Sequence, residues 1–274
     1  MIKSISAWAF DPNRPLPEVF KLARDHGFEA VEVAFGMDGP LNPATTQDDC
    51  REIVAQAQDA GIVLSSVASG LGWSNPITST DPVVAQRGVE LTAQTLRAAA
   101  WLGLDAILLV PGGVGATFNP QLKDAPYDQA YANAQKCLRE LIPVAQETGV
   151  SIGVENVWNM FLLSPLETRN FIDELGSDKV GSYFDVGNVI YSGYAEQWIS
   201  ILGERIKRVH FKDFKRDVGN ISGFCDLLDG DVDYPAVMKA LREIGYDGPV
   251  TAEFFTCEAD LGKISSAMDK ILEM

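Results

Sequence analysis

Three carboxylates and one histidine interrupt apolar runs in the second half of the chain. They are Glu155 in VSIGVEN, Asp185 in YFDVGN, His210 in VHFKD and Glu253 in TAEFF. An unpaired carboxylate is costly to bury, so a cation or a reacting group should meet these side chains. Three hard oxygen ligands and one imidazole are typical of a site for Mn²⁺, Mg²⁺, Co²⁺ or Zn²⁺. We therefore expect these four residues to bind one divalent metal ion.

Each of these residues also has an ordinary structural explanation. Glu155 could pair with a lysine, Asp185 could cap a helix, Glu253 could join an ion pair at the mouth of a barrel, and His210 could be a satisfied core histidine. The metal site is favoured because all four occupy equivalent positions in successive apolar runs, which independent accidents would not produce. His26, the only other histidine, lies in RDHGF at a predicted helix end and is given no chemistry.

The elements that must position these side chains follow from the alternation of apolar runs and amphipathic stretches. The apolar runs predict strands, and the amphipathic stretches predict helices, most of which close on a glycine suited to a helix C-cap. The strands are expected at 2–10, 29–35, 62–69, 105–112, 150–156, 180–187, 206–214 and 249–255, and helices at 16–27, 48–61, 88–103, 131–149 and 234–248.

Eight such strand and helix units predict an α/β fold, a (β/α)8 TIM barrel with a single domain over residues 1–274. An open doubly wound sheet is the alternative, but no G-x-G-x-x-G follows the first strand. In a TIM barrel the chemistry lies at the C-terminal ends of the strands. The four candidate ligands would therefore meet at one mouth of the barrel.

Composition and charge exclude several classes of function. The formal net charge is −16, from 22 Lys and Arg against 38 Asp and Glu, which argues against nucleic acid as a partner. No apolar run approaches the roughly 18 residues of a membrane span. We expect no leader sequence, since no basic segment followed by an apolar one precedes the first predicted strand. The scattered cysteines predict free thiols and a cytoplasmic protein. They are Cys50, Cys137, Cys225 and Cys257.

At the four strand ends the sequence resembles the sugar phosphate isomerase/epimerase group of xylose-isomerase-like barrels. This group includes ketose 3-epimerases, L-xylulose 5-phosphate 3-epimerases and hydroxypyruvate isomerases, and the resemblance covers essentially the whole chain. It implies that Glu155 and Glu253 are both metal ligands and the pair that shuttles the proton. Many members carry a histidine three residues after the aspartate and a second glutamate shortly after the first. Here those positions hold Asn188 and Trp158.

Further residues are candidates for substrate binding. Trp8 and Trp158 could pack against a sugar or only against neighbouring side chains. Asn156 and Asn188 could donate to sugar hydroxyls, orient the ligands or only satisfy backbone groups in tight turns. Lys212 should face the same side as His210 because side chains alternate along a strand. Phosphorylated and free sugars remain equally compatible, since the KDFKR segment (212–216) and the glycines of VPGGVG and ASGLGW could meet a phosphate.

The expected reaction is proton abstraction beside a ketone. A metal bound by the ketone and the adjacent hydroxyl would stabilise an enediolate, and a carboxylate would then suffice as base. Two glutamates on opposite faces would give epimerisation, whereas a base on one face would give aldose–ketose isomerisation. A keto-inositol dehydratase and a non-catalytic sugar-binding barrel are the alternatives. An abasic-site DNA endonuclease is disfavoured by the two histidines and the acidic charge. The oligomeric state is open, with a homo-oligomer as one option.

Overall fold

The computed structural model describes residues 1–116 and 125–274. In this part of the chain, eight parallel strands close into a barrel in the order β1-β10-β7-β6-β5-β4-β3-β2. A short antiparallel pair, β8 (Asp213–Phe214) and β9 (Phe224–Cys225), lies outside the barrel. The barrel strands are β1 (Ile2–Ser6), β2 (Ala30–Ala34), β3 (Val63–Ala68), β4 (Ala106–Leu109), β5 (Ser151–Glu155), β6 (Val180–Asp185), β7 (Ile206–Phe211) and β10 (Pro249–Ala252).

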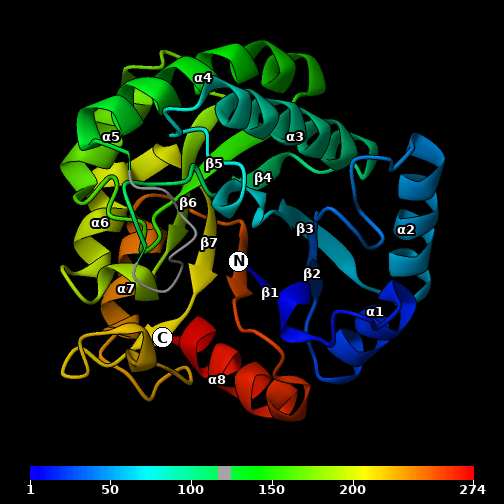
Figure 1. The fold of residues 1–274 in the computed structure, drawn as a ribbon. Helices are drawn as coiled ribbons and strands as arrows, with labels where there is room; N and C mark the ends of the chain where they lie inside the picture. Colours follow the sequence, from blue (N-terminus) through cyan, green and yellow to red (C-terminus); the bar gives the residue numbers. More distant parts are fainter. Residues whose placement is uncertain (117–124) are drawn as a thin grey trace.

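Helices form a ring around the barrel (Figure 1). Their apolar faces cover strands that are themselves nearly fully buried, as expected for a parallel sheet. The helices are α1 (Leu16–Asp25), α2 (Gln47–Asp59), α3 (Pro82–Trp101), α4 (Tyr127–Thr148), α5 (Pro165–Asp173), α6 (Ala195–Leu202), α7 (Tyr234–Glu243) and α8 (Leu261–Glu273). The predicted TIM barrel is thus confirmed, with the last barrel strand numbered β10 because the β8–β9 pair precedes it.

Local signals explain where the helices begin and end. A capping box of Thr46 and Asp49 starts α2, and Gly149, with a φ of 75°, ends α4. Helix α3 begins six residues before the predicted position 88, because Asp81 caps the backbone N–H of Val83 and Pro82 occupies the first turn. Asp81 and Pro82 precede the amphipathic pattern, so the pattern alone does not indicate this helix start.

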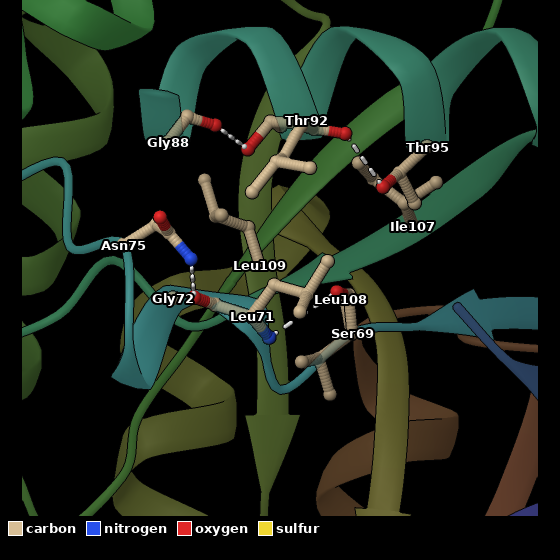
Figure 2. A pocket seen from close by; sticks show the side chains of 11 residues that line it. Ser69, Leu71, Gly72, Asn75, Gly88, Thr92, Thr95, Ile107, Leu108 and Leu109 are labelled. Atoms are coloured by element: carbon tan, nitrogen blue, oxygen red, sulfur yellow. Dashed lines mark hydrogen bonds between the residues drawn. The ribbon is translucent and has the colours of Figure 1, made fainter. Parts of the chain in front are cut away.

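A small internal space lies between α3 and the neighbouring strands (Figure 2). Thr92 and Thr95 border it, and their hydroxyls donate to the backbone carbonyls of Gly88 and Leu91 one helical turn earlier. Its volume of about 10 Å³ is no larger than one water molecule requires. It is a packing feature, too small for a sugar.

Two expectations about the environment of the protein can be compared with the structure. Within residues 1–116 and 125–274, no helix combines the length and the apolar character that a membrane crossing requires. All four cysteines carry free thiols, those of Cys50 and Cys137 buried and those of Cys225 and Cys257 half-buried.

Candidate metal centre and active site

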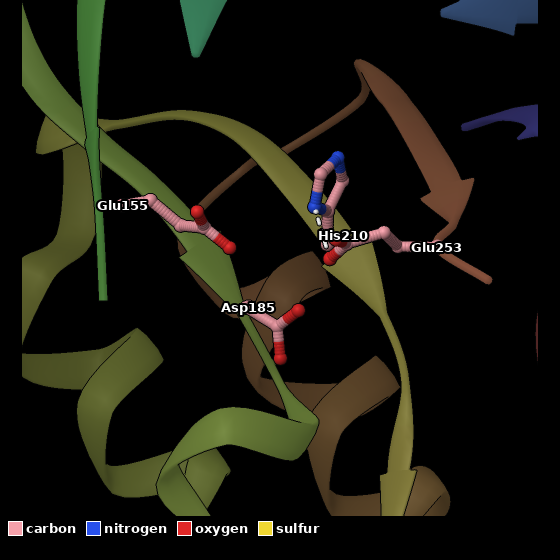
Figure 3. A group of neighbouring side chains, drawn as sticks. All are labelled: Glu155, Asp185, His210 and Glu253. Atoms are coloured by element: carbon pink, nitrogen blue, oxygen red, sulfur yellow. Dashed lines mark hydrogen bonds and ion pairs between the residues drawn. The ribbon is translucent and has the colours of Figure 1, made fainter. Parts of the chain in front are cut away.

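Four neighbouring strands bring the candidate ligands together. Glu155 and Asp185 end β5 and β6, His210 lies in β7 opposite Asp185, and Glu253 directly follows β10. One ligand atom from each residue lies within 4.8 Å of those of the other three. Figure 3 shows the three carboxylates and the imidazole converging from these strands. The strand ends thus place four buried metal-type ligands around one point.

The donor set fits a divalent cation. Asp185 is fully buried, yet its Oδ2 atom accepts no hydrogen bond from the described residues. Its other oxygen, Oδ1, accepts from the backbone N–H of Asn188 at 2.7 Å, which fixes the carboxylate plane. The Lys212 ammonium lies 3.4 Å from Oδ2 without forming a hydrogen bond to it, so this buried oxygen remains open to a bound cation. Glu155, Asp185, His210 and Glu253 are the residues that would hold the ion.

Lys212 extends into the same cluster from the end of β7. Its Nζ atom lies 2.8 Å from Glu253 Oε2 and 3.4 Å from Asp185 Oδ2. It also lies 5.2 Å from the ring centroid of Phe224. The ammonium is largely buried and partly neutralises the three carboxylates, so the cluster contains its own cation.

The two glutamates have opposite proton affinities. Burial, reinforced by the negative charge of Glu253, raises the pKa of Glu155 well above its usual range. Burial acts in the same direction on Glu253, but Lys212 and His210 outweigh it and hold the pKa of Glu253 below its usual range. Burial also raises the pKa of Asp185 to about 6, against the effect of Lys212. At neutral pH Glu155 therefore holds a proton more readily than Glu253.

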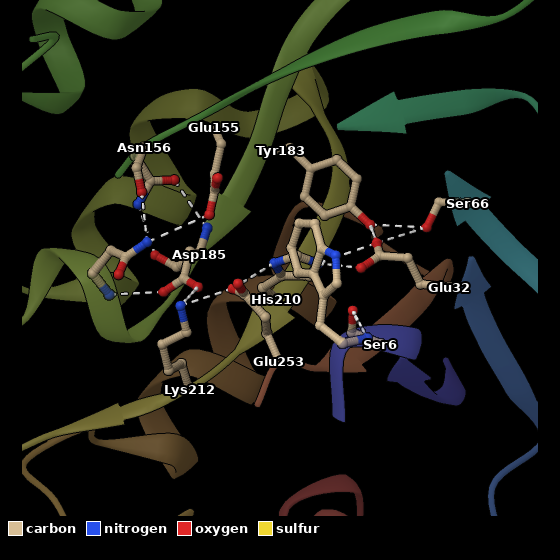
Figure 4. A network of polar contacts seen from close by, with 12 residues as sticks. Ser6, Glu32, Ser66, Glu155, Asn156, Tyr183, Asp185, His210, Lys212 and Glu253 are labelled. Carbon is tan, nitrogen blue, oxygen red and sulfur yellow. Dashed lines mark hydrogen bonds and ion pairs between the residues drawn. The ribbon is translucent and has the colours of Figure 1, made fainter. Parts of the chain in front are cut away.

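A second group of buried polar residues orients His210 (Figure 4). Its Nε2 atom lies 3.0 Å from Oε1 and 3.1 Å from Oε2 of Glu32, a fully buried residue of β2 on the opposite side of the barrel. Ser66 and Tyr183 donate hydrogen bonds to the same carboxylate. His210 Nδ1 faces Glu253 Oε2 at 3.0 Å. Burial alone would lower the pKa of His210, but Glu32 and Glu253 raise it well above its usual range.

The two asparagines play different parts. Asn156 donates to the backbone C=O of Asp185 and accepts from its N–H, at 2.7 and 2.9 Å, and it is absent from the described lining of the large cavity. Asn156 thus satisfies the backbone groups of Asp185, and its role in substrate binding stays a prediction. Asn188 lines the cavity and donates to the backbone C=O of Asn156 at 2.9 Å. Trp158 also lines the cavity and donates to the backbone C=O of Asn188.

Comparisons with known proteins identify the family. The model of the xylose isomerase-like TIM barrel family matches residues 20–273. The chain belongs to this family. It is 28% identical to an L-ribulose 3-epimerase of Mesorhizobium japonicum over 86% of this chain and 74% of that protein. It is 23% identical to the L-ribulose-5-phosphate 3-epimerase UlaE of Salmonella paratyphi A, over 92% of this chain and 87% of that protein. A solved L-ribulose 3-epimerase structure superposes with a TM-score of 0.81 at 21% identity, and the match covers 99% of this chain and 94% of that chain.

Some site residues of this xylose isomerase-like barrel were missed at the sequence level. Glu32, Ser66 and Tyr183 were not singled out, although Glu32 interrupts the apolar run EAVEVAF just as Glu155 interrupts its own. The signal that could have found Glu32 is a carboxylate inside a strand that should be buried on both faces. His26 lies at the end of α1, where its ring contacts the backbone C=O of Leu22, away from the metal ligands.

Proposed function

We propose that this chain is a divalent-metal-dependent sugar epimerase that acts on a ketone through a two-base proton transfer. The carrying observation is that two buried glutamates, with pKa values displaced in opposite directions, lie in one cluster of metal-type ligands. The names of the relatives, which are epimerases of free and phosphorylated sugars, support the same reaction class. The free thiols support a cytoplasmic location.

A bound divalent cation would supply Lewis-acid stabilisation of negative charge on the substrate oxygens. Glu253, the more readily ionised carboxylate, removes the proton from the carbon beside the ketone. Glu155, the more readily protonated one, returns a proton to the opposite face of that carbon. Pairs of titratable groups with separated pKa values are typical of acid/base partners. In the reverse reaction the two glutamates exchange roles.

Replacement of the glutamates tests this assignment. Glu155→Gln and Glu253→Gln should each lower kcat by about 10²- to 10⁴-fold, because an amide cannot carry the proton. Glu204→Gln, which changes an exposed glutamate in the turn before β7, is the matched control and should keep wild-type kcat. Wild-type rates in both glutamine variants would refute the proposed pair.

The fate of the proton separates epimerisation from its alternatives. In D₂O a two-base epimerase should place solvent deuterium in the product, since the base that removes the proton is not the group that returns one. Transfer of the substrate's own hydrogen to the neighbouring carbon, without solvent label, would indicate an aldose–ketose isomerase. A product that has lost water would indicate a dehydratase.

A further inference from the structure

The site continues into a cavity that is larger than one sugar requires. The described residues line a cavity of about 1320 Å³, whereas pockets for drug-sized ligands measure about 300–1,000 Å³. Glu155, Asn188 and Glu253 form part of its buried lining, while Phe255 is 67% exposed. A monosaccharide held at the ligands would fill only the buried end. The outer part is therefore available to a second group.

Aromatic side chains form much of the wall beyond the ligands. Trp8, which follows β1, stacks on Phe255, which follows β10, with ring centroids 5.7 Å apart and an interplanar angle of 21°. A partly exposed stack of this kind offers flat apolar area to a ligand ring at little conformational cost. Trp73, Trp158 and Phe224 also line the cavity. The outer wall is thus suited to a ring, sugar or aromatic.

The charges of the lining disfavour an anionic second group. Among the described lining residues, Arg14 is paired with Glu258 and Glu18, and Lys212 is paired with Glu253 and Asp185. Among the described residues, Lys215, which is exposed, is the one lining cation without an ion pair. The carboxylates of the lining are Asp11, Asp38, Glu155, Asp226, Asp229 and Glu253. Asp226 and Asp229 pair with Lys263, and Glu253 pairs with Lys212. The described lining still carries more carboxylates than cations, which disfavours a phosphate.

We infer that the substrate is a glycoside-sized keto sugar, with its sugar ring at the four ligands and an uncharged ring substituent against Trp8 and Phe255. This inference rests on the proposed function and narrows its substrate class. The anomeric carbon of a glycoside is an acetal, so the ketone must be another ring carbon beside a free hydroxyl. The C–H proton passes to Glu253, its electron pair enters the enediolate, and Glu155 returns a proton. No oxidant or reductant is needed.

The test compares two substrates that differ only in the substituent. The methyl and phenyl glycosides of one ring-oxidised hexose are incubated with the Mn²⁺-loaded protein in D₂O, and exchange of the C–H beside the ketone is followed by NMR. D-fructose and D-fructose 6-phosphate serve as the free and phosphorylated ketoses. The phenyl glycoside should exceed the methyl glycoside in kcat/KM by at least about tenfold, or about 1.4 kcal/mol, since each buried ring contributes on the order of this free energy.

Two variants assign the preference to the stack. Phe255→Ala and Trp8→Ala should each reduce the phenyl-to-methyl ratio of kcat/KM towards one. Tyr194→Ala changes an aromatic residue that is 54% exposed and outside the described cavity lining, and it should keep the wild-type ratio. Phenyl β-D-glucopyranoside, which lacks the ketone, provides a readout without turnover. Isothermal titration calorimetry should show that the wild type binds phenyl β-D-glucopyranoside more tightly than D-glucose. In Phe255→Ala the two sugars should bind with similar affinity.

Each contrary outcome has a distinct meaning. Equal kcat/KM for the two glycosides would overturn the outer subsite and leave the epimerase proposal intact. A preference for D-fructose 6-phosphate that disappears in Lys215→Met would identify the outer cavity as a phosphate site, which also overturns the inference. If no sugar exchanges its proton, the proposed function fails. The binding of phenyl β-D-glucopyranoside against D-glucose then decides the subsite by itself.

Discussion

At the residue scale, Glu32 illustrates how the surroundings of a ligand set its chemistry. A metal-binding imidazole generally donates its second N–H to a carboxylate, which fixes the ring and its tautomer. The contact between His210 Nε2 and Glu32 has this geometry, with Ser66 and Tyr183 holding the carboxylate in place. The Tyr183 ring also packs edge-on against the imidazole, with centroids 4.6 Å apart. His210 Nδ1 is thereby directed at the cluster of carboxylates.

We predict that Glu32→Gln weakens Mn²⁺ binding by about 10- to 100-fold, the usual effect of removing a charged partner of a ligating histidine. The amide keeps the size of the side chain but removes its negative charge. Isothermal titration calorimetry on metal-depleted protein measures the affinity, and circular dichroism checks the fold. Glu29→Gln is the matched control, because Glu29 is an exposed glutamate three residues earlier. Equal affinity in wild type and Glu32→Gln would show that Glu32 is not needed to orient His210.

The sequence allowed the four candidate ligands to be predicted, but it did not allow the contact of Glu32 with His210 to be predicted. Glu155, Asp185 and Glu253 stand out because each ends or follows an apolar run, and His210 stands out because it interrupts one. Glu32 lies within VEV, and a single polar residue between two valines is equally typical of a strand whose side chains alternate between core and solvent. Contact between β2 and β7 across the barrel depends on closure, which the order of elements along the chain does not specify. The stacking of Phe255 on Trp8 could not be predicted for the same reason, because the two residues follow the last and the first barrel strands.

At the element scale, the short β8–β9 pair shows how one carboxylate can organise a loop. Asp213 is fully buried, and its two oxygens accept from the backbone N–H groups of Phe214, Leu228, Gly230 and Val232. This holds residues 224–232 beside the cavity, of which Phe224, Cys225, Asp226 and Asp229 are lining residues. The sequence pattern predicted one continuous strand to residue 214. The structure ends β7 at Phe211 and begins the separate pair at Asp213.

We predict that Asp213→Ala loosens this segment without unfolding the barrel. Four N–H groups lose a charged acceptor, and hydrogen bonds to charged groups contribute about 1.5–3 kcal/mol each. Amide hydrogen exchange at Leu228, Gly230 and Val232 should accelerate at least about tenfold, while exchange in β5 and β6 stays slow. Asp217→Ala, which removes an exposed aspartate nearby, should leave all these rates unchanged. Unaltered exchange at the three amides in Asp213→Ala would contradict the role of Asp213.

At the scale of the whole molecule, metal binding and folding should be linked but separable. The proposed site exists only when four strands are in register, so a cation bound there stabilises the folded state alone. Lys212 already lies among the carboxylates, with Nζ 2.8 Å from Glu253. Its ammonium reduces their mutual repulsion. The barrel should therefore fold before the metal is loaded.

We predict that Mn²⁺ raises the Tm by several degrees and that EDTA reverses the shift without unfolding the protein. At a free metal concentration 100 times Kd the free energy of unfolding increases by about 2.7 kcal/mol. The shift should shrink as the pH falls, because the raised pKa of Glu155 means that metal must displace a proton from it. Differential scanning calorimetry at several pH values measures both effects. Asp185→Asn should show little shift, and an equal shift in this variant would refute the site.

The order of strands divides the barrel into two halves with different freedom to evolve. The strands that carry the four candidate ligands, β5, β6, β7 and β10, are contiguous, and β1 to β4 form the other half. Segments after β1 to β4 supply Trp8, Phe35, Trp73 and Val110 to the cavity wall but none of the four metal-type ligands. Loops grafted from a relative onto these four strands would exchange one substrate preference for another while the proposed proton-transfer groups stay in place. Directed evolution of this barrel should begin in that half.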